Sequence, residues 1–411
     1  PGANPGLTRS GDGDKPATYA TGETPGRPQA RRIRSPKTAA SFLSAQSLAN
    51  RLVDSGASLA SLNSARRVLK YFTLPIVIVV LALTAVSVIY SVNIGSEALD
   101  QEAIWQVIVS RLEGVSSGNK AVETIVWDLR LPRALLAVVV GAGLSIAGCA
   151  VQTLVRNPLA DPYLLGVSSG ASVGATAVIT FGVLSGFGLW STSVGALIGA
   201  LGAAMAVYLV AMAQGGLTPI RLVLSGVVLS SAFSAIASFL VFKGPDPRAA
   251  QSVLHWLLGS VSGAQWDRLP LATSVVLICL VLLLVSSSWL DALAWGPDAA
   301  AALGIPVGAL RQGLFVLLAV LVGVLVAVSG GIGFVGLVIP HLCRMVVGSL
   351  HRRLLPLAAA IGGLFLLWVD VISRVVVAPA EMPLGVVTGL IGAPVFLIVM
   401  GRRNYGFGGG S

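Results

Sequence analysis

Residues 163–220 form a run of 58 residues that contains no Asp, Glu, Lys, Arg or His. A transmembrane helix needs about 20 consecutive apolar residues, so this run has room for two crossings, separated at Gly186, Phe187 and Gly188. In an ordinary soluble domain about a quarter of the residues are charged. The run therefore predicts a polytopic membrane protein.

The basic charge of the chain gathers at its N-terminus. Residues 1–70 hold 11 Lys and Arg against 4 Asp and Glu, although the whole chain is 55% hydrophobic and only 11% charged. Residues 1–65 offer little apolar surface, which predicts a disordered basic cytoplasmic tail beside anionic lipid. A nucleic-acid arm is the weaker reading, because no pattern of interleaved aromatic residues accompanies the basic ones. Residues 404–411 predict a C-terminal tail that ends in linker-type residues.

Windows of about 19 residues with high apolar content predict ten membrane spans. They cover residues 72–92, 133–155, 163–183, 190–213, 219–242, 270–288, 311–329, 334–349, 354–377 and 384–401. The predicted fold class is an all-α polytopic membrane protein of about ten transmembrane helices, formed by residues 66–403. Glycines four residues apart, such as Gly170 and Gly174, predict helices that approach closely in lipid.

The basic residues between the spans predict the orientation. With the N-terminal tail inside, ten crossings return the C-terminus to the inside, as the positive-inside rule expects for the basic loops. Those inner loops carry Arg66, Arg67, Lys70, Arg156, Arg221, Arg311, Arg352, Arg353, Arg402 and Arg403. The opposite orientation places this set outside and is the weaker assignment. We expect a multi-pass membrane protein with both termini in the cytoplasm.

Two arginines one helical turn apart stand at the predicted outer end of the second span. Residues 127–133 read WDLRLPR, with Arg130 and Arg133 ahead of 22 uncharged residues. Such a pair can receive carboxylates from a soluble partner. The alternative, which the spacing alone favours, is interfacial anchoring by arginines whose side chains reach back to the membrane surface.

Two further segments stand out. Residues 156–166, RNPLADPYLLG, predict a rigid double-proline turn at the inner face. Residues 330–344, GGIGFVGLVIPHLCR, predict a glycine-rich outer turn that leads into a short span with His341 and Arg344 at membrane depth. Ionisable residues at that depth are candidates for a transport pathway, although a single His on an apolar face is more often a hydrogen-bonded packing residue.

Together with residues 370–374 (DVISR) and 381–394 (EMPLGVVTGLIGAP), these segments make residues 70–403 resemble the FecCD family of ABC-importer permeases. The resemblance implies a type II importer fold in which two permease copies, here as a homodimer, surround the pathway. It also implies two cytoplasmic ATPase subunits and an extracytoplasmic substrate-binding lipoprotein or periplasmic protein. The cargo of the family is a ferric siderophore, haem or cobalamin, and the iron-containing cargoes are our first expectation.

The resemblance also implies roles for particular residues. Arg130, Arg133 and Arg374 match the arginines that receive glutamates of the binding protein, and Asn157 and Leu159 match the cytoplasmic gate. Residues 291–308 match the segment that couples to the ATPase, with the candidates Leu293, Asp298, Ala299, Ala302, Leu303 and Gly304. The residues themselves agree, because a Gly-Pro start at 296–297 and Gly304 bound a short alanine-rich helix.

The sequence carries no motif for catalysis. Residues 114–120 have the wrong spacing for a phosphate-binding loop, and we find neither a nucleophile elbow nor a metal-ligating pair of histidines. We therefore expect a transport subunit that is not an enzyme and binds no cofactor or metal, with ATP and magnesium on the partner ATPase. The rival class is an ion-coupled secondary transporter, which usually needs buried carboxylates; Asp370 and Glu381 are the late candidates.

Overall fold

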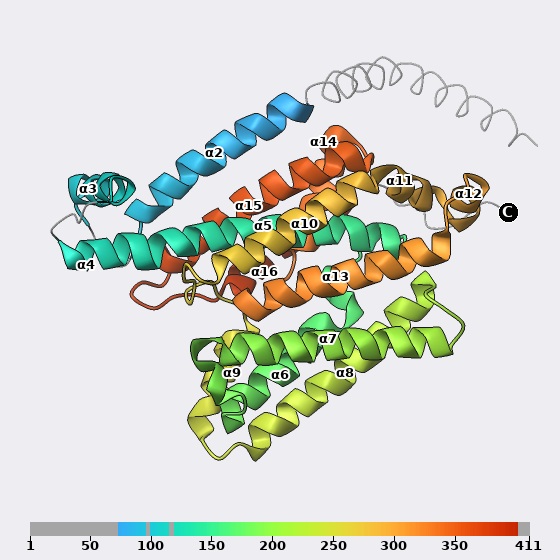
Figure 1. The fold of residues 1–411 in the computed structure, drawn as a ribbon, viewed down its shortest axis with the longest axis horizontal. Coiled ribbons are helices and arrows are strands. Elements are labelled where there is room, and N and C mark those ends of the chain that lie inside the picture. The colour runs from blue at the N-terminus through green and yellow to red at the C-terminus, as the bar shows by residue number, and fades with distance from the viewer. Residues whose placement is uncertain (1–72, 96–98, 115–118, 402–411) are drawn as a thin grey trace, which may run out of the picture. The chain divides into compact units, whose positions relative to one another are not determined.

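The computed structural model describes residues 73–95, 99–114 and 119–401 (Figure 1). Every regular element in these ranges is a helix, which confirms the all-α prediction. The predicted tail of residues 1–65 and the C-terminal residues 404–411 lie outside the described residues.

Each of the ten predicted spans coincides with one helix. These helices are α2 (Thr73–Asn93), α5 (Leu131–Leu154), α6 (Val167–Phe181), α7 (Ser191–Ala213), α8 (Pro219–Lys243), α10 (Leu269–Val285), α13 (Val307–Ser329), α14 (Val335–Val347), α15 (His351–Val375) and α16 (Leu384–Gly401). Within the described ranges, six spans are long and apolar enough to cross a membrane, or seven if α10 and the bent continuation α11 (Ser287–Trp295) form one. The crossings by the shorter helices α6, α14 and α16 stay predictions.

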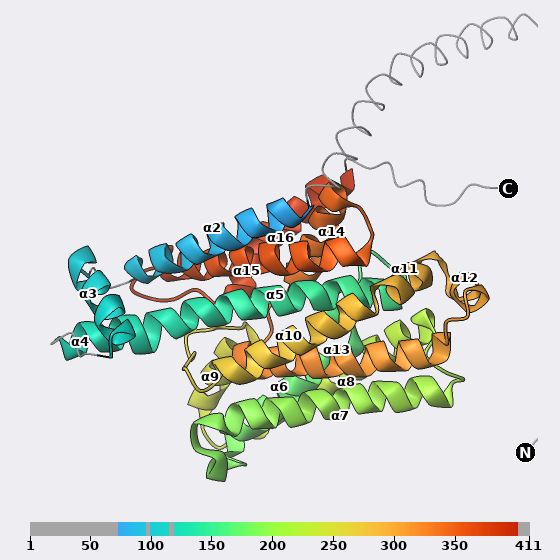
Figure 2. The same ribbon diagram turned by 45° about the horizontal axis from the view of Figure 1, so that its top comes forward.

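Helix α5 is the centre of the packing. It lies between α2, α14 and α15 on one side and α10 and α13 on the other, and it contacts all five (Figure 2). Nearly every side chain of α5 is buried. Helices α2 and α8 instead expose long apolar side chains, such as Leu74 and Phe242, because lipid takes the place of a protein core on that side.

Glycine pairs hold α6 against α7. A Cβ atom on Gly174 would collide with the carbonyl oxygen of Gly195, and one on Gly170 would lie 2.4 Å from the carbonyl oxygen of Gly199. Small residues let two backbones approach where lipid supplies no hydrophobic drive for association. The close packing predicted from Gly170 and Gly174 is confirmed.

Several short helices between the spans were not predicted. They are α3 (Gln101–Leu112), α4 (Lys120–Glu123), the π-helix η1 (Thr124–Arg130) and α9 (Pro247–Leu257). Helix α9 nevertheless carries a local signal, since Asp246 accepts a hydrogen bond from Arg248 N ahead of Pro247 at the first helical position. Helix η1 runs directly into α5 and thereby fixes where the arginines of 127–133 lie.

Candidate functional site

Three arginines from distant parts of the sequence meet at one end of α5. The positive-inside rule predicts that this end is extracytoplasmic, and we call it the outer end. Arg130 ends η1, Arg133 lies in the first turn of α5, and Arg374 lies in the last turn of α15. They line a pocket of about 310 Å³ together with Gly95, Ser262 and Glu381, which we call the arginine pocket.

Arg133 bridges two carboxylates in the arginine pocket. Its Nε donates to Asp370 Oδ1 at 2.8 Å and its Nη1 donates to Glu381 Oε1 at 2.7 Å. Asp370 is fully buried and also pairs with Arg374 Nη2 at 3.0 Å, whereas the Glu381 side chain is 40% exposed. A buried carboxylate needs such partners to stay charged. Asp370 is therefore the internal carboxylate of the cluster, and Glu381 is the carboxylate at its solvent-exposed side.

The end of α2 completes the cluster. Arg130 Nη1 donates to Val92 O at 2.8 Å, and Arg374 Nη1 donates to Ile94 O at 2.9 Å. The last carbonyl groups of a helix lack intrahelical partners and carry partial negative charge, so they suit cations. The guanidinium groups are thereby held beneath the protein surface. This differs from the interfacial anchoring that the spacing of the arginines alone favours.

Among the described residues, the arginine pocket brings three guanidinium groups together with the carboxylates of Asp370 and Glu381. Guanidinium groups that line a pocket are suited to receive a carboxylate. Sequence reasoning named Asp370 and Glu381 as candidate carboxylates but missed their pairing with Arg133. The spacing of Asp370 and Arg374 by four helical positions was a local signal for the pairing of those two residues.

The predicted coupling segment lies at the opposite, inner end. Helix α11 is followed by α12 (Pro297–Ala302), with Gly296 between them at φ 132° and Gly304 after them at φ 78°, conformations that favour glycine. Asp298, Ala299, Ala302, Leu303 and Gly304 are exposed. Leu293 is fully buried, so of the six candidates it alone packs inside this chain and is not available to a partner.

Two large apolar side chains protrude at this inner end. Trp295 is 84% exposed and Leu303 is 73% exposed, at the ends of α11 and α12 respectively. Apolar side chains on a turn between helices, away from the long spans, are suited to a partner's groove. Trp295 was not among the predicted coupling residues.

A chain of hydrogen bonds ties α11 to α15 and α5. His351 Nδ1 lies 2.6 Å from Asp291 Oδ1, and His351 Nε2 lies 2.8 Å from Thr153 Oγ1. Thr153 Oγ1 also lies 3.0 Å from Cys149 O. The buried ring of His351 thus bridges the predicted coupling segment to the end of α5.

The predicted gate residues lie in the turn that follows α5. Asn157 Oδ1 accepts a hydrogen bond from Leu159 N at 2.9 Å, and both residues reach the surface at least partly. Asp161 closes the turn by accepting from Tyr163 N at 2.8 Å. Burial raises the pKa of Asp161 to about 6, against the opposing effect of that hydrogen bond. The rigid reversal predicted for 156–166 is confirmed.

The gate turn also borders a cavity of about 260 Å³ at the inner end. Gln152, Arg156, Ala294 and His351 are among its lining residues, so the turn and helix α11 share one space. Arg344 lines it as well and donates to Gln152 Oε1.

His341 occupies a different position from Arg344, although both lie on α14. It is buried, and its ring lies edge-on to Phe396 of α16 at 6.5 Å between centroids.

The glycine-rich turn before α14 is held by Tyr163, whose hydroxyl accepts from Ile332 N at 2.9 Å and donates to Ile332 O at 3.1 Å. The structure thus brings the 156–166 and 330–344 segments together.

The arrangement matches known transport proteins. The model of the FecCD transport family matches residues 81–402. The hemin transport system permease protein HmuU of Yersinia pestis is 40% identical over 327 residues, which cover 79% of this chain and 94% of that protein. The cobalamin import system permease protein BtuC of Halobacterium salinarum is 39% identical over 282 residues, which cover 69% and 74%. Other relatives are named for molybdate and iron(3+)-hydroxamate import.

A solved structure described as an inward-facing conformation of a metal-chelate type ABC transporter is also similar. It is 33% identical with a TM-score of 0.70, and the match covers 80% of this chain and 99% of that one. One conclusion follows from the apolar helices, from the residues at the two ends of α5 and from these relatives. The chain belongs to the FecCD transport family and is a multi-pass permease subunit of an ABC importer in the cytoplasmic membrane.

Proposed function

We propose that this permease carries a ferric siderophore or haem into the cytoplasm in an importer driven by a separate ATPase. One observation supports the proposal most. Helices α5 and α15 run antiparallel, and each reaches from the arginine pocket to the coupling segment: Arg133 bonds Asp370 at one end, and Thr153 bonds His351 at the other. A helix of this length is about 36 Å long, enough to cross the hydrocarbon core.

The arginine pocket is the proposed docking site of a substrate-binding protein. Its guanidinium groups, gathered in one pocket, suit carboxylates of an incoming protein. Arg130, Arg133 and Arg374 take this role. Because each head group is already oriented by a carbonyl or a carboxylate, little ordering entropy is lost when a partner binds.

The inner end is the proposed contact with an ATPase subunit, and the importer of two permease copies holds two such subunits. Asp298, Ala299, Ala302, Leu303 and Gly304 form the contact surface, to which we add Trp295 because of its exposure. Movement of α11 passes through the Asp291–His351–Thr153 chain to the end of α5. There it shifts Asn157 and Leu159, the proposed gate, with His341 and Arg344 on the pathway side of α14.

The cargo is proposed from the relatives. Relatives named for hemin and for iron(3+)-hydroxamate support an iron chelate, and a relative named for cobalamin supports the alternative of cobalamin. The permease acts with a second copy of itself in this proposal. ATP and magnesium bind to the ATPase subunits.

An ion-coupled carrier is the alternative of another class. It would use Asp370 or Glu381 to carry an ion, since these are the carboxylates near the ends of the late spans. Asp370, however, is neutralised by Arg133 and Arg374 at 2.8 and 3.0 Å. A buried carboxylate that already pairs with two guanidinium groups serves as a fixed part of the structure, which favours the ATP-driven importer.

The decisive experiment is extraction of the chain from its native membrane in mild detergent, with quantification of the proteins that copurify. An ATPase subunit in a one-to-one ratio is the expected result. A chain that is repeatedly recovered alone, from membranes in which transport of an iron chelate persists without ATP, would overturn the proposal in favour of an ion-driven carrier.

A further inference from the structure

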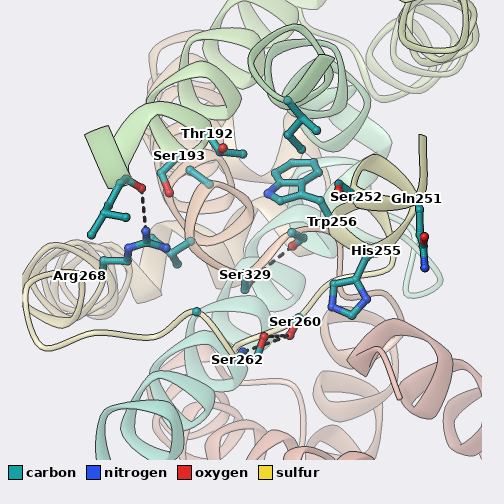
Figure 3. Close-up of a pocket in the computed structure, with 16 residues that line it drawn as sticks. Thr192, Ser193, Gln251, Ser252, His255, Trp256, Ser260, Ser262, Arg268 and Ser329 are labelled. Carbon is teal, nitrogen blue, oxygen red and sulfur yellow. Dashed lines mark hydrogen bonds between the residues drawn. The ribbon is translucent and has the colours of Figure 1, made fainter. Parts of the chain in front are cut away.

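A second cavity lies at the outer end, beside the arginine pocket. It has a volume of about 530 Å³ and is enclosed by the first turn of α7, by α9, by the end of α13 and by residues 260–268 (Figure 3). We call it the outer cavity. Pockets for organic small molecules span about 300–1,000 Å³, so its size suits an organic ligand.

The outer cavity is lined by hydrogen-bonding groups that the protein leaves unused. Thr192 and Ser193 of α7 lie on one side of it, and Gln251, Ser252 and His255 of α9 lie on the other (Figure 3). Within the described residues, none of these five side chains makes a hydrogen bond. Gln251, Ser252 and His255 are exposed, so water can satisfy them, whereas Ser193 is only 8% exposed and lines the cavity. Ser193 is therefore the group among the five that points to a ligand.

The charge of the outer cavity is positive. Arg268 is held at its edge, where Nη2 donates to Leu189 O at 2.8 Å and the guanidinium lies over the Trp190 ring at 5.7 Å. Its buried Nε has no hydrogen-bond partner among the described residues. The described residues that line the cavity include no Asp or Glu. Ligand atoms that accept hydrogen bonds or carry negative charge are favoured here.

Apolar walls complete the outer cavity. Ile179, Ala327, Val328 and Trp256 are among its lining residues, and an aromatic or aliphatic ligand surface packs against such walls. A small tetrahedral oxyanion would leave these walls unmatched and would reach few of the separated donors at once. The lining therefore favours an organic ligand over a small oxyanion.

We propose that the outer cavity is a cargo-binding site for an organic iron chelate that presents carboxylate or hydroxamate oxygens, and not for an oxyanion such as molybdate. This inference rests on the proposed import function and narrows its substrate class. The hydroxyl groups of α7, the amide and imidazole of α9 and the guanidinium group of Arg268 bind the acceptor oxygens. Trp256 and the apolar walls bind the organic part.

The position of the outer cavity links it to docking. Ser262 lines both the outer cavity and the arginine pocket. The segment between them is bonded to the start of α16, because Leu384 N donates to Gly259 O and Gly385 N donates to Leu258 O, both at 2.9 Å. A chelate released by a protein docked on the arginine pocket is therefore close to the outer cavity.

Direct binding to the full chain in lipid nanodiscs tests the site. Radio-iron ferrioxamine B and radio-iron haemin are each measured by equilibrium dialysis, with sodium molybdate as competitor. The test variant is Ser252→Trp, which fills the cavity. The matched control is Leu254→Trp, on the same helix but outside the lining; both positions are exposed, so both variants are expected to fold.

We expect saturable binding of at least one chelate to the unaltered chain, binding at least about tenfold weaker in Ser252→Trp and within about twofold of unaltered in Leu254→Trp. Molybdate should not compete. The proposal is overturned if neither chelate saturates, if both variants bind alike, if molybdate competes, or if Ser252→Trp weakens only the docking of a binding protein. Copurification of the ATPase is unaffected by these outcomes, so failure of the site and failure of the import function are distinguishable.

Discussion

Arg133 Nε donates to Asp370 Oδ1 at 2.8 Å across 237 positions of sequence, which joins the first turn of α5 to the C-terminal part of α15. The contact lies beneath the outer surface, and Asp370 is fully buried. The arginine pocket is therefore part of the internal structure of the protein as well as a candidate docking surface. Substitutions in it have to be chosen with both roles in mind.

The first prediction concerns stability. Arg133→Gln leaves buried Asp370 with one cation instead of two, and we expect it to lower the free energy of unfolding by on the order of 3 kcal/mol. Glu381→Gln removes a partner that is 40% exposed, so the loss should stay below about 1 kcal/mol. Thermal denaturation of both variants in the same detergent makes the comparison. Equal losses would mean that the burial of Asp370 does not govern the cluster.

The second prediction concerns docking. Glu381 occupies Arg133 Nη1 at 2.7 Å, so a carboxylate from a binding protein has to displace it. Glu381→Gln removes that competing charge, and we expect docking to tighten about tenfold, chiefly through slower dissociation. Surface plasmon resonance with the copurified binding protein measures both rates.

Asp128→Asn is the control for the docking prediction. Asp128 is exposed on η1, and its replacement changes the charge of the outer end by the same amount. It should alter the association rate alone, and salt should suppress the effect. Weaker docking by Glu381→Gln would show instead that Glu381 orients Arg133 for its partner.

The third prediction concerns the ATPase contact. Leu303 is 73% exposed, and an apolar side chain at the centre of an interface typically contributes at least about 2 kcal/mol, or about 30-fold in affinity. Leu303→Asp should abolish copurification of the ATPase while the melting temperature is kept. Ala309→Asp adds the same charge to an exposed position on α13 and should leave copurification intact. Retention of the ATPase by Leu303→Asp would remove Leu303 from the contact.

The fourth prediction concerns coupling. Thr153→Val keeps the size of the side chain but leaves the buried His351 Nε2 without its hydrogen-bond partner, at a cost of about 1–3 kcal/mol. In proteoliposomes with the ATPase and binding protein, we expect more ATP hydrolysed per chelate imported, because α11 is less firmly tied to the end of α5. Thr153→Ser keeps the hydroxyl and should restore the ratio. A lower melting temperature with an unchanged ratio would make the chain of hydrogen bonds structural only.

The spans were predictable because each depends on a local property of the sequence. The window 133–155, for example, corresponds to α5 at Leu131–Leu154, since an apolar run of that length folds as a helix wherever lipid is the solvent. Helix α9 escaped prediction, although Asp246 and Pro247 supplied a start signal. Helix α9 is short, and with polar residues such as Gln251 and His255 it contains too few apolar residues for a span window.

Pairing between distant residues was beyond the reach of local patterns. The sequence by itself determined the membrane class, the ten apolar helices and the arginine, turn and coupling motifs, because hydropathy, turn chemistry and charge are read over a few neighbouring residues. Only the tertiary structure decided that Arg133 sits between Asp370 and Glu381, that Leu293 is buried while Trp295 protrudes, and that α7 and α9 enclose a cavity. These contacts arise where helices far apart in sequence pack against one another, and the packing depends on the shapes of all the surfaces involved.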